Sequence, residues 1–121
     1  MRSTQQEHGT ARRVVAIRGE LDIAAAPRLY AGLTEIMRRH TPDLVLDLSA
    51  LTFCDSSGVT VLVRLAEAAR LLGGELVLAA PAPRVAKVLR LTGVDRTFTV
   101  HPTVLAASRG PAVRDEIAIG P

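Results

Sequence analysis

Short apolar runs alternate along the chain with segments in which apolar residues recur at helical spacing. Four runs rich in Val, Leu, Ile or Phe are predicted to be strands, over residues 14–17, 44–48, 75–79 and 97–100. The first three are apolar at nearly every position, which is typical of strands covered on both faces. The fourth is short and is expected near an edge of the sheet.

Amphipathic helices are predicted between these strands, because apolar residues line one side of each intervening segment. The helices are expected to begin at Pro27, near Ser57 and near Pro83, and the second and third to end at Leu72 and Gly93. Residues 102–108 are predicted to form a short last helix. Strand–helix–strand units of this length favour parallel strands joined by right-handed crossovers.

The pattern therefore predicts an α/β fold, in which a mixed, largely parallel sheet carries packed helices within a single domain over residues 13–108. Residues 1–12 are polar and could supply only a marginal edge strand. Residues 109–121 are predicted to be a flexible C-terminal tail. Within this tail, residues 112–119 form either a loose end or a short docking segment.

Composition narrows the class of protein. The chain has 121 residues and 48% hydrophobic content, enough for one core, with only three aromatic residues for stacking a flat ligand. The single Cys54 excludes an internal disulfide and a cysteine-built metal site. No apolar run approaches the roughly 20 residues of a membrane span, and the N-terminus lacks the apolar centre of a signal peptide. We therefore expect a cytoplasmic protein without a membrane partner.

The net charge of +3 does not indicate a nucleic-acid partner. Nucleic-acid binding favours a basic stripe, usually with aromatic side chains on which bases stack. Here the basic residues alternate with acidic ones, apart from the adjacent pairs Arg12-Arg13 and Arg38-Arg39. This arrangement is typical of an ordinary solvated surface.

The most informative segment is 44–65, where a buried strand is followed by a short connection and a long apolar helix. Asp55-Ser56-Ser57-Gly58 opens this helix, and Phe53 and Cys54 before it are expected to fill the core beneath. Asp and Ser are good N-cap residues, because their oxygens accept from the unpaired N–H groups of the first turn. Taken alone, these residues are explained by capping.

Together with Gly19-Glu20-Leu21-Asp22 at the end of the first strand, this segment resembles the STAS family, the fold of bacterial anti-sigma factor antagonists. The likeness extends from about Val14 to Ala107 and includes Leu91-Thr92-Gly93 after the third helix. In that family, the first serine of Asp-Ser-Ser-Gly is the phosphoacceptor for a partner kinase that is itself an anti-sigma factor. The resemblance thus implies Ser56 as the phosphoacceptor, with Ser57 as the second choice.

The resemblance also implies the partners and the switch. An anti-sigma factor serine kinase and a phosphatase are the expected partners. The unphosphorylated chain would bind the kinase and release a sigma factor, and phosphorylation would block binding. The implied partner-binding residues are Asp22, Asp55, Ser56, Ser57, Gly58, Val59 and Thr60. The alternative within the family is an adapter subunit of a lipid-transport ABC assembly or of a stress-sensing complex.

Three features depart from the family pattern. Thr60 stands where the family often has Gly, and could alter the close approach of a partner. Ala24-Ala25-Ala26 stands where a Thr often precedes the helical Pro, which removes a cap worth about 1 kcal/mol. The N-terminal strand common in the family is poorly marked.

The sequence gives little support for an enzymatic function. No Gly-x-Ser-x-Gly surrounds Ser56, and three histidines lie in polar or connecting segments, namely His8, His40 and His101. The nearest acidic cluster is Asp43, Asp47 and Asp55, whose spacing fits no familiar ligand set. No glycine-rich nucleotide-binding loop is present. We therefore expect no catalytic residues, no bound metal and no cofactor.

Overall fold

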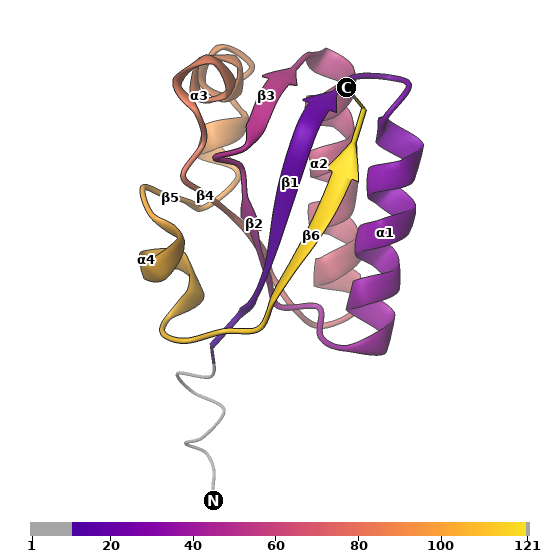
Figure 1. Ribbon diagram of the computed structural model, residues 1–121, viewed down its shortest axis with the longest axis vertical. Helices are drawn as coiled ribbons and strands as arrows, with labels where there is room; N and C mark the ends of the chain where they lie inside the picture. The colour runs from indigo at the N-terminus through magenta and orange to yellow at the C-terminus, as the bar shows by residue number, and fades with distance from the viewer. Residues whose placement is uncertain (1–10, 121) are drawn as a thin grey trace, which may run out of the picture.

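The structure is a computed structural model that describes residues 11–120, so the possible N-terminal edge strand falls mostly outside the described residues (Figure 1). Within this range, six strands alternate with four α-helices and one short 3-10 helix. In chain order these are β1 (Arg13–Leu21), α1 (Ala26–Arg39), β2 (Leu44–Asp47), β3 (Leu51–Cys54), α2 (Ser56–Leu71), β4 (Leu76–Ala79), α3 (Pro83–Leu91), η1 (Val94–Arg96), β5 (Val100–His101), α4 (Val104–Ser108) and β6 (Arg114–Ile119).

Strand β1 lies inside the sheet and pairs with three other strands. Its residues 13–16 pair with β2 and residues 19–21 pair with β3, while β6 pairs with residues 14–19. The amides of Arg13 and Gly19 donate to the carbonyl oxygens of residues 43 and 50, which precede β2 and β3, whereas the Val14 amide donates toward β6, to residue 113. Since odd and even amides of a strand point to opposite edges, β2 and β3 lie end to end along one edge of β1, and β6 lies along the other. The sheet continues from β2 to β4 and from β4 to β5, and every pairing among the described residues is parallel. The predicted α/β fold with a largely parallel sheet is thereby confirmed.

Alternate residues of the strands face two apolar layers. Helices α1 and α2 cover one face of the sheet, and α4 lies on the other (Figure 1). The larger core includes Val15, Ile17 and Leu46 of the strands, and the smaller core includes Val14, Val45 and Val77 from the opposite face. This two-sided burial explains why the strand sequences are continuously apolar.

The structure corrects two of the predicted strand assignments. Residues 51–54, read from the sequence as a connection, form β3 because they pair with residues 19–21 of β1. The last predicted strand shifts to Val100–His101, since η1 occupies 94–96 and Phe98 turns into the core. This strand does lie at the edge of the sheet, as expected.

The expectation of a flexible tail over residues 109–121 is wrong for residues 114–119, which form the edge strand β6. Six residues of β6 pair with β1, and Ile119 is completely buried. Ion pairs also tie β6 to the sheet: Arg13 Nε lies 2.6 Å from Asp115 Oδ2, and Arg114 Nη2 lies 2.9 Å from Asp47 Oδ2. The segment is therefore part of the folded domain.

Gly19 allows β6 to approach β1 closely. Its φ of +124° is unfavourable for other residues, and a Cβ at this position would lie 1.7 Å from the Ile119 carbonyl oxygen. The glycine of the Gly-Glu-Leu-Asp motif thus has a structural task that its position in the sequence does not reveal.

Candidate functional site

The two motifs meet at the carboxyl ends of β1 and β3. These strands are paired in parallel, with Leu21 opposite Cys54, so both chains leave the sheet at the same end. The amide of Asp55 donates to the Leu21 carbonyl oxygen at 3.4 Å. Asp22 and Ser56 therefore follow directly on two residues that are hydrogen-bonded to each other.

The first turn of α2 presents Ser56 to solvent. Asp55 is the N-cap, and its Oδ1 accepts a hydrogen bond of 3.1 Å from the Gly58 amide. Ser56 is the first helical residue and is exposed, whereas Ser57 is half-buried. The hydroxyl of Thr60 donates to the Ser56 carbonyl oxygen at 3.0 Å, which places Thr60 one turn further along the same exposed side.

Gly58 and Val59, both predicted for the partner-binding surface, are buried. A Cβ on Gly58 would lie 2.7 Å from Cys54 Sγ and 2.8 Å from the Leu21 carbonyl oxygen. Their side of the helix faces the sheet, so these two residues shape the start of α2 rather than its outer surface. The accessible part of the candidate site consists of Asp22, Asp55, Ser56, Ser57 and Thr60.

Asp22 also organises the loop that leads into α1. Its Oδ1 accepts from the Ala25 amide at 3.0 Å, and its carbonyl oxygen accepts from the Ala26 amide at 3.0 Å. Ala25 occupies the N-cap position and provides no side-chain hydrogen bond, as the sequence predicted. Asp22 therefore supplies the polar contact closest to this uncapped helix end.

Cys54 is buried, as expected, and Phe53 is not. Burial, aided by the negative charge of Asp55, raises the pKa of the Cys54 thiol to about 11, so the thiol stays protonated and unreactive at neutral pH. The side chain of Phe53 is 38% exposed, because in β3 only the end residues Leu51 and Cys54 face the core. The expectation that Phe53 fills the core is therefore wrong.

Sequence reasoning missed the end of β6 beside the site. Ala118 and Gly120 border a hollow of about 470 Å³ together with Asp22, Ala25 and Arg28. The Arg28 guanidinium reaches the Ala118 carbonyl oxygen at 3.5 Å. The alternating Ile117 and Ile119 were the signal for a strand here, but two apolar residues are a weak one.

The other candidate residues do not form a second centre. Among residues 11–120, no three His, Cys, Asp or Glu side chains could jointly hold a metal ion. Asp43 accepts from the Glu75 amide and Asp47 pairs with Arg114, so both serve the structure of the sheet. His8 lies outside the described residues. No helix of the described part is both long and apolar enough to cross a bilayer.

Curated relatives carry the name that the motifs suggested. The chain is 30% identical over 100 residues to the anti-sigma-F factor antagonist RsfB of Mycobacterium tuberculosis, covering 80% of this chain and 79% of RsfB. It is 29% identical over 98 residues to the anti-sigma F factor antagonist of Paenibacillus polymyxa, covering 80% and 84% of the two chains.

Solved structures agree with these relatives. An anti-sigma factor antagonist from Mycobacterium paratuberculosis is 34% identical, with a TM-score of 0.66 over 77% of this chain and 81% of that one. SpoIIAA in its unphosphorylated form is 27% identical, with a TM-score of 0.65 over 79% and 85%. The STAS domain family matches residues 2–107, which include both motifs and the sheet end where they meet. This chain belongs to the STAS domain family.

Proposed function

We propose that this chain is an anti-sigma factor antagonist whose unphosphorylated form binds an anti-sigma factor kinase and so releases a sigma factor. Phosphorylation of Ser56 ends this binding, and a phosphatase restores it. The observation that carries the proposal is the exposed Ser56 at the first position of α2, beside the Asp22 loop. The chain acts by binding in the cytoplasm and catalyses no reaction of its own.

The names of the relatives support this function, and one of them, SpoIIAA, is known in an unphosphorylated form. The surface formed by Asp22, Asp55, Ser57 and Thr60 around Ser56 is what the partner would contact. Because Ser56 is exposed between Asp55 and Ser57, and Thr60 lies one turn further along, a group added to Ser56 lies inside the proposed contact area.

The phosphoryl transfer uses ATP bound by the partner kinase. The Ser56 Oγ attacks the γ-phosphorus, and its new bond to phosphorus forms as the bond to the β-phosphate oxygen breaks. The hydroxyl proton passes to a base of the kinase, and ADP leaves. The exposure of Ser56 permits this approach, whereas Ser57 is half-buried.

The phosphate acts at the interface and leaves the fold intact. Helix N-termini tolerate anions, because the free N–H groups of the first turn and the helix dipole favour negative charge. The phosphate adds a charge of roughly −1.5 to −2 next to the carboxylates of Asp22 and Asp55. An acidic or apolar partner surface then meets repulsion and an uncompensated desolvation cost.

The site of phosphorylation is tested by intact mass after incubation with the matched kinase and ATP. We expect a gain of one phosphoryl group in the wild type and in Ser57→Ala, and none in Ser56→Ala. Ser57→Ala is a matched control, because it removes a hydroxyl from the same first turn. If Ser56→Ala were phosphorylated as fully as the wild type, the assignment of Ser56 as the phosphoacceptor would be wrong.

The switch is tested by the affinity of the kinase for Ser56→Glu, which carries a permanent negative charge. We expect binding at least about 100-fold weaker than that of the wild type, with an unchanged circular dichroism spectrum. Equal affinity would contradict the switch. The adapter alternative predicts a different partner, so a pull-down that recovers a transporter ATPase instead of a small kinase would favour it.

A further inference from the structure

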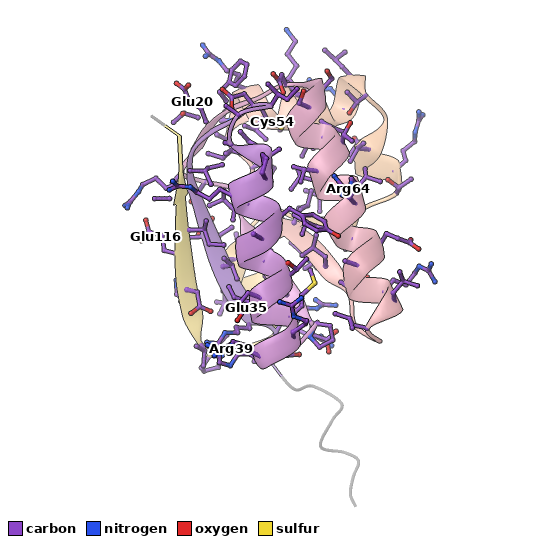
Figure 2. All side chains as sticks on the ribbon, turned by 90° about the vertical axis from the view of Figure 1, so that its right-hand side faces the viewer. Glu20, Glu35, Arg39, Cys54, Arg64 and Glu116 are labelled. Carbon is purple, nitrogen blue, oxygen red and sulfur yellow. The ribbon has the colours of Figure 1, made fainter. Side chains whose placement is uncertain are left out.

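A groove of about 380 Å³ lies between α1 and α2. We call it the α1–α2 groove and define it by Ile23, Ala26, Tyr30, Val61 and Arg64. Its lining is mostly apolar, and the side chain of Ile23 is 76% exposed. Figure 2 shows the two helices side by side, with Arg64 on α2 and Cys54 near the end that carries the Ser56 site.

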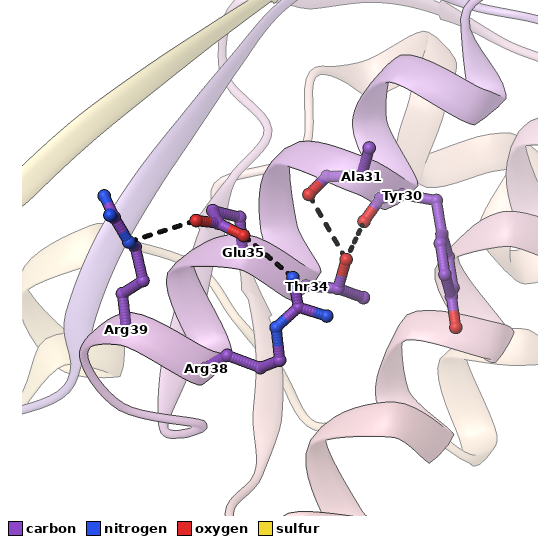
Figure 3. A network of polar contacts seen from close by, with 6 residues as sticks. All are labelled: Tyr30, Ala31, Thr34, Glu35, Arg38 and Arg39. Carbon is purple, nitrogen blue, oxygen red and sulfur yellow. Dashed lines mark hydrogen bonds and ion pairs between the residues drawn. The ribbon is translucent and has the colours of Figure 1, made fainter.

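The groove offers one fixed positive charge. The guanidinium carbon of Arg64 lies 4.7 Å from the centre of the Tyr30 ring, a cation–π contact that holds the side chain across the groove. In Figure 3 the Tyr30 ring points away from the side chains of Glu35, Arg38 and Arg39 and toward the neighbouring helix. The Thr34 hydroxyl donates to the Tyr30 carbonyl oxygen at 2.8 Å.

Arg64 differs from its neighbours in having no carboxylate partner within residues 11–120. Arg38 and Arg39 both pair with Glu35 (Figure 3), and Arg70 pairs with Glu67. The remaining ion pairs of the described chain involve other elements and leave Arg64 out. A guanidinium stacked on a ring keeps its N–H edges free, and these edges match the two oxygens of a carboxylate.

The groove is continuous with the Ser56 site. Ser56, Thr60 and Arg64 are all exposed and follow one another at four-residue spacing, so they lie along one side of α2 within about 12 Å. Ile23, which lines the groove, directly follows Asp22 in the chain. A partner that covers Ser56 and Thr60 therefore reaches Arg64 one turn further along α2.

We infer that the α1–α2 groove binds an acidic, amphipathic segment of the anti-sigma kinase. An aliphatic side chain of this segment fills the space between Ile23 and Tyr30, and a carboxylate of the segment pairs with Arg64. The inference rests on the proposed function and adds a specificity determinant to it. It also explains how the phosphate weakens binding. The carboxylates of the kinase segment that Arg64 attracts are repelled by a phosphate on the same side of α2.

The test measures the affinity of the matched anti-sigma kinase for charge variants of the full chain. We expect Arg64→Glu to weaken binding at least about 10-fold and Arg64→Ala about 3-fold, with weaker salt dependence in both. Arg109→Glu is the matched control, since it makes the same charge change at an exposed residue after α4, across the sheet, and should change affinity less than about 2-fold. Tyr30→Leu should weaken binding about 3-fold by freeing Arg64.

The outcomes separate the two proposals. If the wild type does not bind the kinase, the proposed function fails. If the wild type binds and Ser56→Glu does not, but Arg64→Glu binds as tightly as the wild type, only the groove inference is overturned. Sedimentation of the chain alone gives a further check, because a wild-type dimer dissociated by Arg64→Glu would show that a second copy occupies the groove instead.

Discussion

Strand β1 borders two regions that are built in opposite ways. Along its outer edge it receives β6, where Ile119 is fully buried and Gly19 leaves no space for a side chain. At its carboxyl end, Leu21 accepts a hydrogen bond from the Asp55 amide at the start of α2, and the neighbouring Ser56 and Ile23 are open to solvent. The difference teaches that one strand can stabilise the fold through the residues along its edge and present a recognition surface through the residues that follow its end.

Two glycines sharpen the comparison, since each permits a close backbone approach. Gly19 meets the backbone of Ile119 and Gly120 at the end of β6, and Gly58 meets Leu21 and Cys54 directly beneath Ser56. A substitution at Gly19 should therefore change folding without redesigning the site, whereas one at Gly58 should disturb both. Four substitutions in and around these regions are expected to differ in their cost in free energy of unfolding.

The largest effect is expected for Gly19→Ala. Its Cβ would meet the Ile119 carbonyl oxygen at 1.7 Å and the Gly120 carbonyl oxygen at 2.8 Å, so β6 has to move or detach. We expect the free energy of unfolding in urea to fall by at least about 3 kcal/mol. Gly110→Ala is the control, because Gly110 has a similar φ of +120° but no atom within 4 Å of its Cβ position, and should cost about 1 kcal/mol. Similar losses in both variants would show that β6 packing contributes little.

A smaller loss is expected for Gly58→Ala. Alanine is about 1 kcal/mol better than glycine inside a helix, but here its Cβ would lie 2.8 Å from a backbone oxygen and 2.7 Å from a buried sulfur. We expect a net loss of about 2 kcal/mol in urea denaturation, together with weaker kinase binding. Gly32→Ala in α1 meets only the movable Ile117 Cδ1, at 3.0 Å, and should be neutral or stabilising. A stabilised Gly58→Ala protein would contradict this account of the helix start.

Asp47→Asn should cost about 1 kcal/mol at pH 7 and less in acid. Burial alone would raise the pKa of Asp47, but hydrogen bonds from Ser49 and Arg114 outweigh it and hold the pKa below 3.8. A lowered pKa means that the ionised carboxylate stabilises the fold above pH 3.8, and that this contribution disappears as the pH falls below that value. Urea denaturation of both proteins between pH 7 and pH 3 should show their difference shrinking. A difference that stays constant across this range would exclude an ionised Asp47 as its cause.

The smallest change in stability is expected for Ser56→Glu. Ser56 is exposed, and negative charge is favourable in the first turn of a helix, so unfolding should change by no more than about 0.5 kcal/mol. The same variant is expected to lose kinase binding, which makes it the reverse of Gly19→Ala. Thermal denaturation followed by circular dichroism checks the stability. A strongly destabilised Ser56→Glu protein would mean that the two regions are not separate.

Local features of the chain could be read correctly from the sequence. The Asp55 cap, the Pro27 at the first turn of α1 and the burial of Cys54 follow from residue type and immediate neighbours. The strong strands were predictable because their apolar residues are continuous. The assignment of Asp22 and Ser56 to one partner-binding surface followed from the resemblance to a family, and the parallel pairing of β1 with β3 brings the two motifs to the same end of the sheet.

Long-range pairing decided the rest. Residues 51–54 and 114–119 become strands only because β1 offers both of its edges, and neither segment carries a strong strand pattern of its own. The exposure of Phe53 and the stacking of Arg64 on Tyr30 likewise depend on which element lies opposite.

The sequence by itself thus determined the α/β class and the residues that open α2, since caps, turns and apolar periodicity act over a few neighbouring positions. The tertiary structure alone decided that β6 pairs with β1 beside Gly19, and that a groove lined by Arg64 and Tyr30 lies between α1 and α2. The physical reason is that strand pairing and helix packing bring together residues distant in the chain. The energies of these contacts cannot be predicted from the pattern of neighbouring residues.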